Sequence, residues 1–274
     1  MSEFISYLPL ILGLMVAGML GGLIAGLLGV GGGIVLVPAM ALAFEILGYD
    51  ADIYQHMAVG TSLAIIIATG STSALAHYRR GAVMLDIVKL WAPFIIVASF
   101  LGGLMAKLYS GDMLRLIFAF IALFVALNML LPIQEKLLGK LHQSKPVHRI
   151  IAFVVGYISA LMGIGGGSFS VPSLVAFGHK IHKSVGTGAA LGVLIAVPGA
   201  IGFMISGYGV VGRPEFSVGY VNIPALILIG VVASLAAPLG ATLAHRLDAR
   251  KLKLTFAMFL CLVSARMIYQ VIWS

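Results

Sequence analysis

The sequence is poor in charge. Asp, Glu, Lys and Arg make up 9% of its 274 residues, whereas a soluble domain carries about 25%. Hydrophobic residues make up 61%, and the mean hydropathy is +1.12. Several runs of about 20 apolar residues are each long enough to cross a bilayer as a helix. No segment shows the period-2 alternation of an outer-membrane barrel. The sequence therefore predicts an all-α polytopic membrane protein in a lipid bilayer.

Groups that carry chemistry are also scarce. Cys261 is the one cysteine, so no intrachain disulfide forms, and neither Cys nor His occurs at zinc-ligand spacing. Paired acids, a nucleophile motif and a phosphate loop are absent as well. The net charge of +8 comes without a basic stripe interleaved with aromatics, which argues against nucleic acid. The N-terminus holds an acid and no basic region, unlike a cleaved signal peptide. We expect no enzyme, no metal and no cofactor.

One stretch occurs twice. Residues 29–38 read GVGGGIVLVP and residues 163–172 read GIGGGSFSVP; over 22–38 against 156–172, 9 of 17 positions are identical. Glycine clusters free the backbone from helical geometry. A helix that starts after such a cluster turns its unpaired N–H groups toward the break. In membrane transporters this arrangement is a recurring way to hold an anion.

The hydrophobic segments also repeat. The second segment in each half has 11 to 14 residues and reaches roughly 17–21 Å, against a bilayer core of about 30 Å. Such a segment is either a re-entrant hairpin or part of a broken helix. The expected domains are a first repeat (1–135), a cytoplasmic linker (136–149) and a second repeat (150–274). We read ten segments, five per half: 8–28, 34–47, 57–77, 87–107 and 113–132, then 150–164, 168–178, 184–206, 220–244 and 252–272.

The basic residues predict the topology. Thirteen of the 17 Lys and Arg residues fall in or next to loops that a single topology places on one side of the membrane. The positive-inside rule makes that side cytoplasmic. Lys107, Arg115 and Arg213 are then outside, together with both termini, and Arg266 lies in a membrane segment. The sequence is compatible with a bacterial inner membrane.

Corresponding loops of the two halves differ in charge. GYDADIYQH in the first half is acidic, and its partner GHKIHKS is basic. This predicts two homologous repeats inverted relative to each other. Secondary transporters often have this layout, with the substrate site at the repeat interface near the midplane.

These motifs resemble the TauE/SafE sulfite exporter family, also called the toluene sulfonate uptake permease family. The resemblance is carried by GxGGGxxxVP in both halves, by AVGTSLAIII and AHYRRG, and by GTGAALGVLIAVPG. It covers nearly the whole chain. It implies transport of small sulfur-containing anions such as sulfite, thiosulfate and organosulfonates.

The candidate substrate-binding residues follow from the repeat. Close helix packing is the alternative explanation for the glycines, as in the GxxxG pair Gly22 and Gly26. For the hydroxyls the alternative is a bond to a helix carbonyl. Pro38 and Pro172 either gate the site or simply kink their segments. The candidates are Gly31, Gly32, Gly33, Gly165, Gly166 and Gly167, with the hydroxyls of Thr61, Ser62 and Thr187.

Four ionisable residues complete the candidates. Arg266 either pairs with the anion or reaches the outer interface, which its place near the C-terminus favours. His56, His77 and His182 either link transport to protons or cap membrane edges, and capping is the simpler interpretation.

The predicted function is a secondary transporter of a small sulfur anion, working by alternating access. Export down an inside-negative potential needs no coupling ion, and no buried acid cluster is present to carry one, which favours export. The alternatives are an anion channel on the same scaffold, a transporter of another small organic anion, and a membrane-embedded enzyme or assembly subunit. The oligomeric state stays open, with a homodimer as one option.

Overall fold

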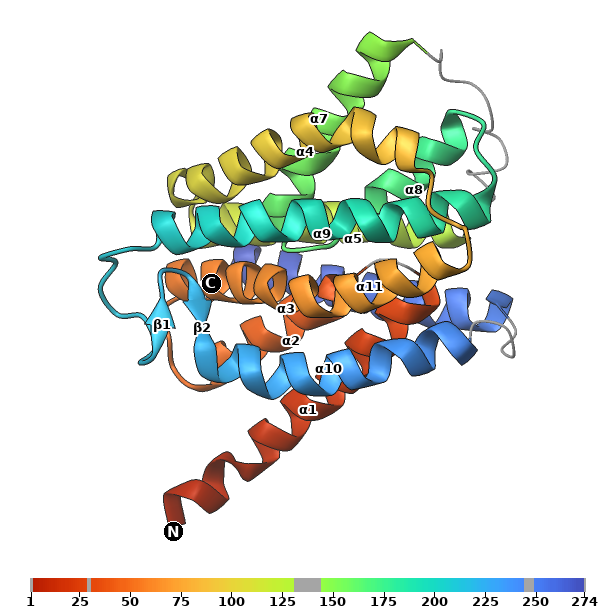
Figure 1. The fold of residues 1–274 in the computed structure, drawn as a ribbon. Coiled ribbons are helices and arrows are strands. Elements are labelled where there is room, and N and C mark those ends of the chain that lie inside the picture. Colours follow the sequence, from red (N-terminus) through yellow and green to blue (C-terminus); the bar gives the residue numbers. More distant parts are fainter. Residues whose placement is uncertain (1, 29–30, 131–143, 244–248, 274) are drawn as a thin grey trace.

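The computed structural model describes residues 2–28, 31–130, 144–243 and 249–273, and nearly all of them are helical (Figure 1). The first half holds α1 (Ser2–Leu28), α2 (Gly33–Ile46), α3 (Ala51–Arg79), α4 (Leu85–Met105), the short η1 (Ala106–Leu108) and α5 (Gly111–Leu130). The second half holds α7 (Lys145–Met162), α8 (Gly167–Ala176), α9 (Ile181–Ser206), α10 (Ile223–Leu243) and α11 (Ala249–Trp273). Two antiparallel strands of two residues, β1 (Ser217–Val218) and β2 (Val221–Asn222), precede α10.

The predicted all-α membrane fold is confirmed. Seven of the described helices are long and apolar enough to cross a bilayer. Large apolar side chains such as Leu235 and Leu262 are exposed on the outside of the bundle, where a bilayer would cover them. The protein is therefore an integral membrane protein that spans the bilayer with helices.

The first helix of each half packs against the other half. α1 packs against α10, and α7 packs against α4, while α3 and α9 pack against each other in the middle. Glycines make these contacts close. A Cβ on Gly22 would lie 2.2 Å from the Ala233 carbonyl oxygen, and one on Gly156 would lie 2.9 Å from that of Ile95. Repeated glycines therefore serve helix packing at these two positions, as small residues commonly do in membranes.

The short helices α2 and α8 each return along the helix before them. Gly21 of α1 faces Leu36 of α2, and Gly32 lies against the carbonyl of Gly21. The return begins at the glycine cluster in both halves, so α1–α2 and α7–α8 are helical hairpins with glycine at the tip. The short segments are thus hairpins, one of the two forms that the sequence left open.

The hairpins start from opposite ends of the bundle. α2 ends where Glu45 contacts Arg266, at the end that also holds β1 and β2 (left in Figure 1). α8 ends near the start of α9, where Lys183 donates to the Gly81 carbonyl. The predicted linker, 136–149, falls mostly outside the described residues, and α7 begins five residues before the expected segment. The inverted relation of the repeats and these domain boundaries stay predictions.

Candidate anion site

The two glycine breaks, residues 31–33 and 163–167, meet inside the bundle. A Cβ on Gly31 would lie 3.2 Å from the Cα of Gly165, and one on Gly33 would lie 2.2 Å from the carbonyl oxygen of Gly163. All these glycines are buried. Ser62, close to the middle of α3, donates to the Gly163 carbonyl at 2.7 Å. The structure therefore brings the glycine candidates and Ser62 together at mid-height.

Glycine is needed at the breaks for two different reasons. Gly31, Gly32 and Gly163 have φ values of 79°, 78° and 67°, which side-chain-bearing residues rarely adopt. Gly166 has an ordinary φ of −60°. Its constraint is space, because a Cβ there would lie 2.8 Å from the Gly192 amide nitrogen.

The electrostatics of the second break favour an anion. At the end of α7, the Gly163 N–H donates to the Ala160 carbonyl and the Ile164 N–H donates to that of Ser159, so the negative end of this helix is capped. By contrast, the first N–H groups of α8, at residues 167–169, meet no acceptor among the described residues. Open N–H groups and the helix dipole together leave a partial positive charge at this end. The break therefore attracts negative charge rather than positive charge.

Three buried serines lie close to these N–H groups in the sequence. Ser168 and Ser170 belong to the first turns of α8, and Ser159 is in the last turn of α7. Their hydroxyls are shielded from solvent and find no hydrogen-bond partner within the described part of the chain. Sequence reasoning missed them. Comparison of the two copies of the motif could have revealed Ser168 and Ser170, because the first copy has Ile34 and Leu36 at the matching positions.

The hydroxyls of Thr61 and Thr187 bond to residues away from the glycine breaks. The hydroxyl of Thr61 accepts the N–H of Asn222, just before α10, at 2.9 Å. Thr187 accepts the N–H of Met84, just before α4, also at 2.9 Å. Both hydroxyls are fully buried. These matched threonines hold the starts of the two matched helices, and their part in substrate binding stays a prediction.

Replacing Thr187 by valine tests this capping role. Valine keeps the shape but leaves the Met84 N–H without its acceptor. We expect the free energy of unfolding to fall by about 1–3 kcal/mol, measured by thermal or denaturant unfolding in detergent. Thr242→Val is the control, because Thr242 is exposed and its hydroxyl bonds only within its own helix, to the Pro238 carbonyl. Equal stability of Thr187→Val and Thr242→Val would contradict the capping role.

The prolines lie inside the short helices, as predicted. Pro38 is in α2 and Pro172 is in α8, five residues after the last glycine of each break. Proline removes the bond to the carbonyl four residues earlier. That carbonyl belongs to Ile34 in one hairpin and to Ser168 in the other, both in the first turn after the break. A gating role for the prolines stays a prediction.

The structure does not bring the three histidines to the glycine breaks. His56 is buried, its two ring nitrogens lie against the carbonyls of Asp52 and Ala106, and its ring stacks on Tyr220 at 4.7 Å. Burial raises the pKa of the Tyr220 phenol above its ordinary value. His182 is exposed at the start of α9. His77, near the end of α3, keeps a buried Nε2 without a partner among the described residues. Proton coupling through any of them stays a prediction.

Arg266 is also away from the breaks. Its Nη2 lies 3.0 Å from a carboxylate oxygen of Glu45, and Gln270 donates to the other oxygen at 2.7 Å. The arginine side chain is 43% exposed. This ion pair joins the end of α2 to α11 and lines a second cavity.

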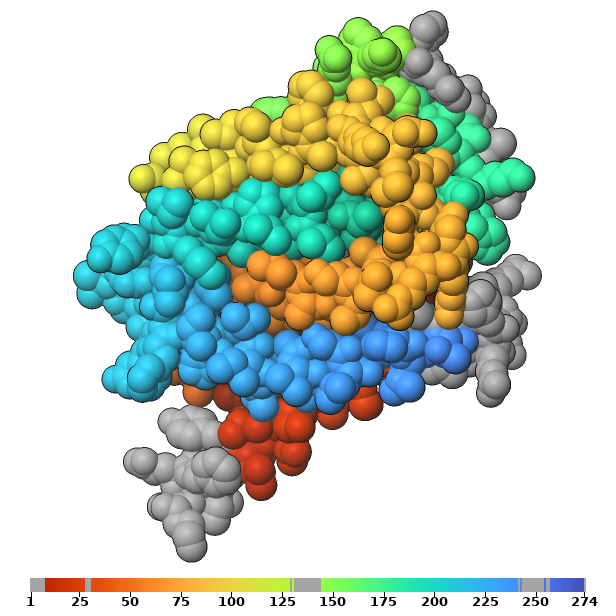
Figure 2. Space-filling model, viewed as in Figure 1, coloured from red at the N-terminus to blue at the C-terminus, as the bar shows by residue number. Residues whose placement is uncertain are grey.

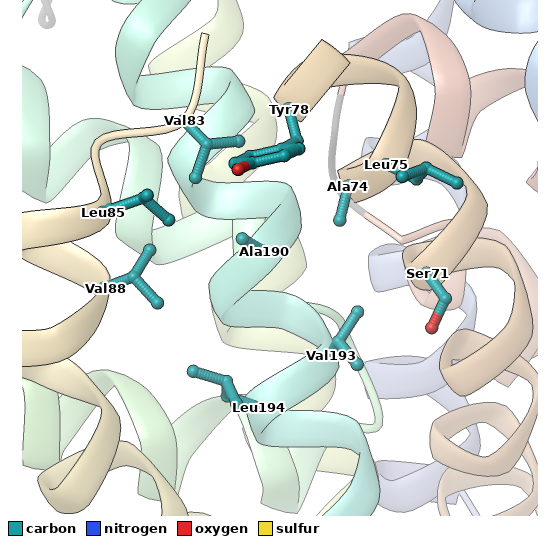
Figure 3. A pocket seen from close by; sticks show the side chains of 10 residues that line it. All are labelled: Ser71, Ala74, Leu75, Tyr78, Val83, Leu85, Val88, Ala190, Val193 and Leu194. Atoms are coloured by element: carbon teal, nitrogen blue, oxygen red, sulfur yellow. The ribbon is translucent and has the colours of Figure 1, made fainter. Parts of the chain in front are cut away.

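A pocket between α3, α4 and α9 has a different character (Figures 2 and 3). It measures about 390 Å³ and is lined almost entirely by aliphatic side chains such as Leu75, Val88 and Leu194. The hydroxyl of Ser71 already donates to the carbonyl of Ile67. This lining suits an acyl chain rather than a small anion.

Helical hairpins with paired breaks inside an integral membrane bundle define a protein of the transporter class. The described residues contain no group of three or more His, Cys, Asp or Glu that would hold a metal. The chain matches the model of the "Sulfite exporter TauE/SafE" family over residues 14–267. It belongs to that family, which confirms the resemblance seen in the motifs.

Relatives support the same class. A "Probable membrane transporter protein" of Haemophilus influenzae is 34% identical over 254 residues, covering 92% of this chain and 96% of that protein. The "Probable membrane transporter protein YunE" of Bacillus subtilis is 27% identical over 280 residues, covering 95% and 98%. No solved structure matches. These names indicate membrane transporters rather than enzymes.

Proposed function

We propose that the protein is a secondary transporter that exports small sulfur-containing anions, such as sulfite, thiosulfate or organosulfonates, across a bacterial inner membrane. The observation that carries this proposal is the meeting of the two glycine breaks at mid-height. There the end of α7 is capped, whereas the first N–H groups of α8 and the buried serine hydroxyls have no partner among the described residues. The family name supports the choice of anion.

The binding chemistry in this proposal relies on neutral donors. A sulfur oxyanion loses its hydrogen bonds to water when it enters the site. In their place it accepts hydrogen bonds from the N–H groups of residues 167–169 and from the hydroxyls of Ser168 and Ser170. Hydrogen bonds to a charged partner contribute about 1.5–3 kcal/mol each, so three or four such bonds replace much of the lost hydration. Because none of the described residues at this site carries a fixed positive charge, the ion is released readily once one side opens.

Alternating access follows from the hairpins. In our proposal the two repeats are inverted, and each hairpin closes the path from the anion to one face of the membrane. Rocking of one repeat against the other opens one hairpin side at a time around the fixed site. The basic loops face the cytoplasm and both termini face outward, as the positive-inside rule predicts.

The proposed direction of transport follows from the negative charge of the substrate. An inside-negative potential of 100 mV favours the exit of each negative charge by about 2.3 kcal/mol. Export therefore proceeds without a coupling ion, whereas import of the same anion needs one. The acids of the described membrane helices lie at helix ends; among them, Glu45 is paired with Arg266 and Asp112 with Arg115.

Purified protein in liposomes tests the proposal. Liposomes loaded with radiolabelled sulfite are expected to release it with a rate that saturates with concentration and rises when an inside-negative potential is imposed. Protein-free liposomes are the control, and labelled thiosulfate and a small alkyl sulfonate are tested in parallel. A rate that stays linear in concentration, with a measurable current, would support the channel alternative. Absence of flux for all three anions would overturn the proposed substrate class.

A further inference from the structure

A second cavity lies at the end of the bundle that holds the Glu45–Arg266 pair. It measures about 340 Å³ and is enclosed by α1, α2, α3, α5 and α11. It extends from Gln270, near the end of α11, to Val35, the third residue of α2. Two of its lining residues are buried and polar, which is unusual for a wall inside a membrane bundle.

The first of these residues is Arg115, in the second turn of α5. Only 2% of the residue is exposed. Its Nη1 lies 3.2 Å from the Asp112 carboxylate, and the guanidinium lies over the Tyr54 ring, 5.0 Å from its centre. Its Nε and Nη2 are shielded from solvent and meet no acceptor among the described residues. An arginine fork with one edge unpaired is suited to an oxyanion, which accepts two N–H bonds side by side.

The second residue is Gln55, which follows Tyr54 in α3. It is fully buried, and neither its amide nitrogen nor its amide oxygen has a partner in the part of the chain that the structure describes. Its NH₂ group adds two donors to those of Arg115. Buried polar groups are normally satisfied, so two such residues on one cavity wall point to a ligand that supplies acceptors.

The charge balance of the cavity agrees with an anionic ligand. Its lining contains Arg115, Arg266 and a single acid, Glu45. Since Glu45 is occupied by Arg266 and Gln270, it does not offset the charge of Arg115. Asp112, which does pair with Arg115, has a side chain that is 50% exposed, and water weakens that pairing.

The remaining walls are apolar and reach the bilayer. Val16 and Leu20 of α1 and Leu262 of α11 line the cavity and are 52%, 46% and 69% exposed on the bundle surface. A ligand that fits both parts carries an oxyanion at one end and a hydrocarbon chain at the other.

We propose that this cavity binds an amphiphilic oxyanion, with its phosphate or sulfonate group on Arg115 and Gln55 and its apolar tail between α1 and α11. The ligand comes either from the bilayer, as an anionic lipid, or from solution, as an alkyl sulfonate. The cavity borders the first glycine break, since Val35 lies two residues after Gly33. Its polar groups, Arg115 and Gln55, are distinct from those that our proposed function assigns to the transported anion, so the two proposals are tested by different variants.

Native mass spectrometry of the purified protein tests the site. With equal amounts of phosphatidylglycerol and phosphatidylcholine, we expect the full chain to retain phosphatidylglycerol at least tenfold more strongly. Arg115→Gln and Gln55→Leu are each expected to lower this retention about tenfold or more, because each removes donors to a charged group. Asn128→Leu is the matched control. It removes a buried amide whose oxygen is unpartnered among the described residues, on α5 but outside the cavity lining, and it should leave retention within twofold.

The two sources are separated by competition with octanesulfonate. Displacement of phosphatidylglycerol by octanesulfonate in the wild type, lost in Gln55→Leu, supports a site open to soluble sulfonates. Retention of the lipid without displacement supports an anionic lipid as occupant. If Arg115→Gln does not fold, judged by thermal unfolding, Gln55→Leu carries the test alone, since it removes amide atoms that have no partner among the described residues. Unchanged retention in the folded variants, or no preference over phosphatidylcholine, would overturn the proposal.

Discussion

Replacing Ser168 by aspartate is expected to abolish sulfite efflux while leaving the protein folded. Ser168 lies in the first turn of α8, among the N–H groups that our proposal assigns to the anion. Two negative charges about 4 Å apart repel by about 4 kcal/mol at an effective dielectric constant of 20. That energy corresponds to a loss of affinity of about a thousandfold, and the liposome assay should show at least a hundredfold lower efflux at low sulfite concentration.

The fold is expected to tolerate this change because an acid in the first turn of a helix interacts favourably with its dipole, by about 0.3–1 kcal/mol. Ser168→Asn is the matched control. It has nearly the same shape as aspartate but carries no charge, and we expect its efflux to stay within about tenfold of the wild type. Equal efflux of the Asp and Asn variants, with equal amounts of folded protein, would show that the anion does not bind at the start of α8.

Much of the fold could be predicted from the sequence, because its cause is local. Apolar runs of membrane length predict spanning helices whatever their partners, and a glycine cluster interrupts a helix by backbone freedom alone. The doubled motif also predicted that the two breaks belong together. In the structure Gly31 does lie against Gly165, which occupies the matching position in the second copy of the motif.

The features that the sequence did not reveal depend on partners far apart in the chain. Thr61 reaches Asn222 and Thr187 reaches Met84, across 161 and 103 residues. A motif such as VGT contains no information on which N–H its threonine will accept. The β1–β2 turn before α10 was missed because two-residue strands leave no periodic pattern.

Charged residues illustrate the same limit. Arg115 was predicted to lie on the outer side with Lys107 and Arg213, but nothing in the sequence indicated that it is buried, with its guanidinium over the Tyr54 ring, in the second turn of α5. Arg266 was correctly seen as a charge in the last segment, but its partner Glu45 lies 221 residues away. Burial of a charge depends on the packing of neighbouring helices, which hydropathy along one segment does not report.

Replacing Gly33 by alanine is expected to have a large structural effect at the proposed site. The added Cβ would lie 2.2 Å from the Gly163 carbonyl oxygen and 2.9 Å from both the Ser62 hydroxyl and the Ile66 side chain. A contact with backbone leaves no side chain to move aside, so the two breaks must separate. We expect efflux at the background of protein-free liposomes and a clear fall in the thermal unfolding temperature.

Gly230→Ala is the matched control, since Gly230 lies within α10 and a Cβ there would meet its nearest neighbours, Ile65 and Leu226, at 3.8 Å. Alanine also has the higher helix propensity, by about 1 kcal/mol, so this variant should be as stable as the wild type or more so. Adding Ser62→Ala to Gly33→Ala removes one of the contacts but not the one with the Gly163 carbonyl. It should therefore not restore efflux. A Gly33→Ala protein with wild-type stability and efflux would mean that the two hairpin tips do not touch in the working transporter, and the anion would then have to cross at another level of the bundle.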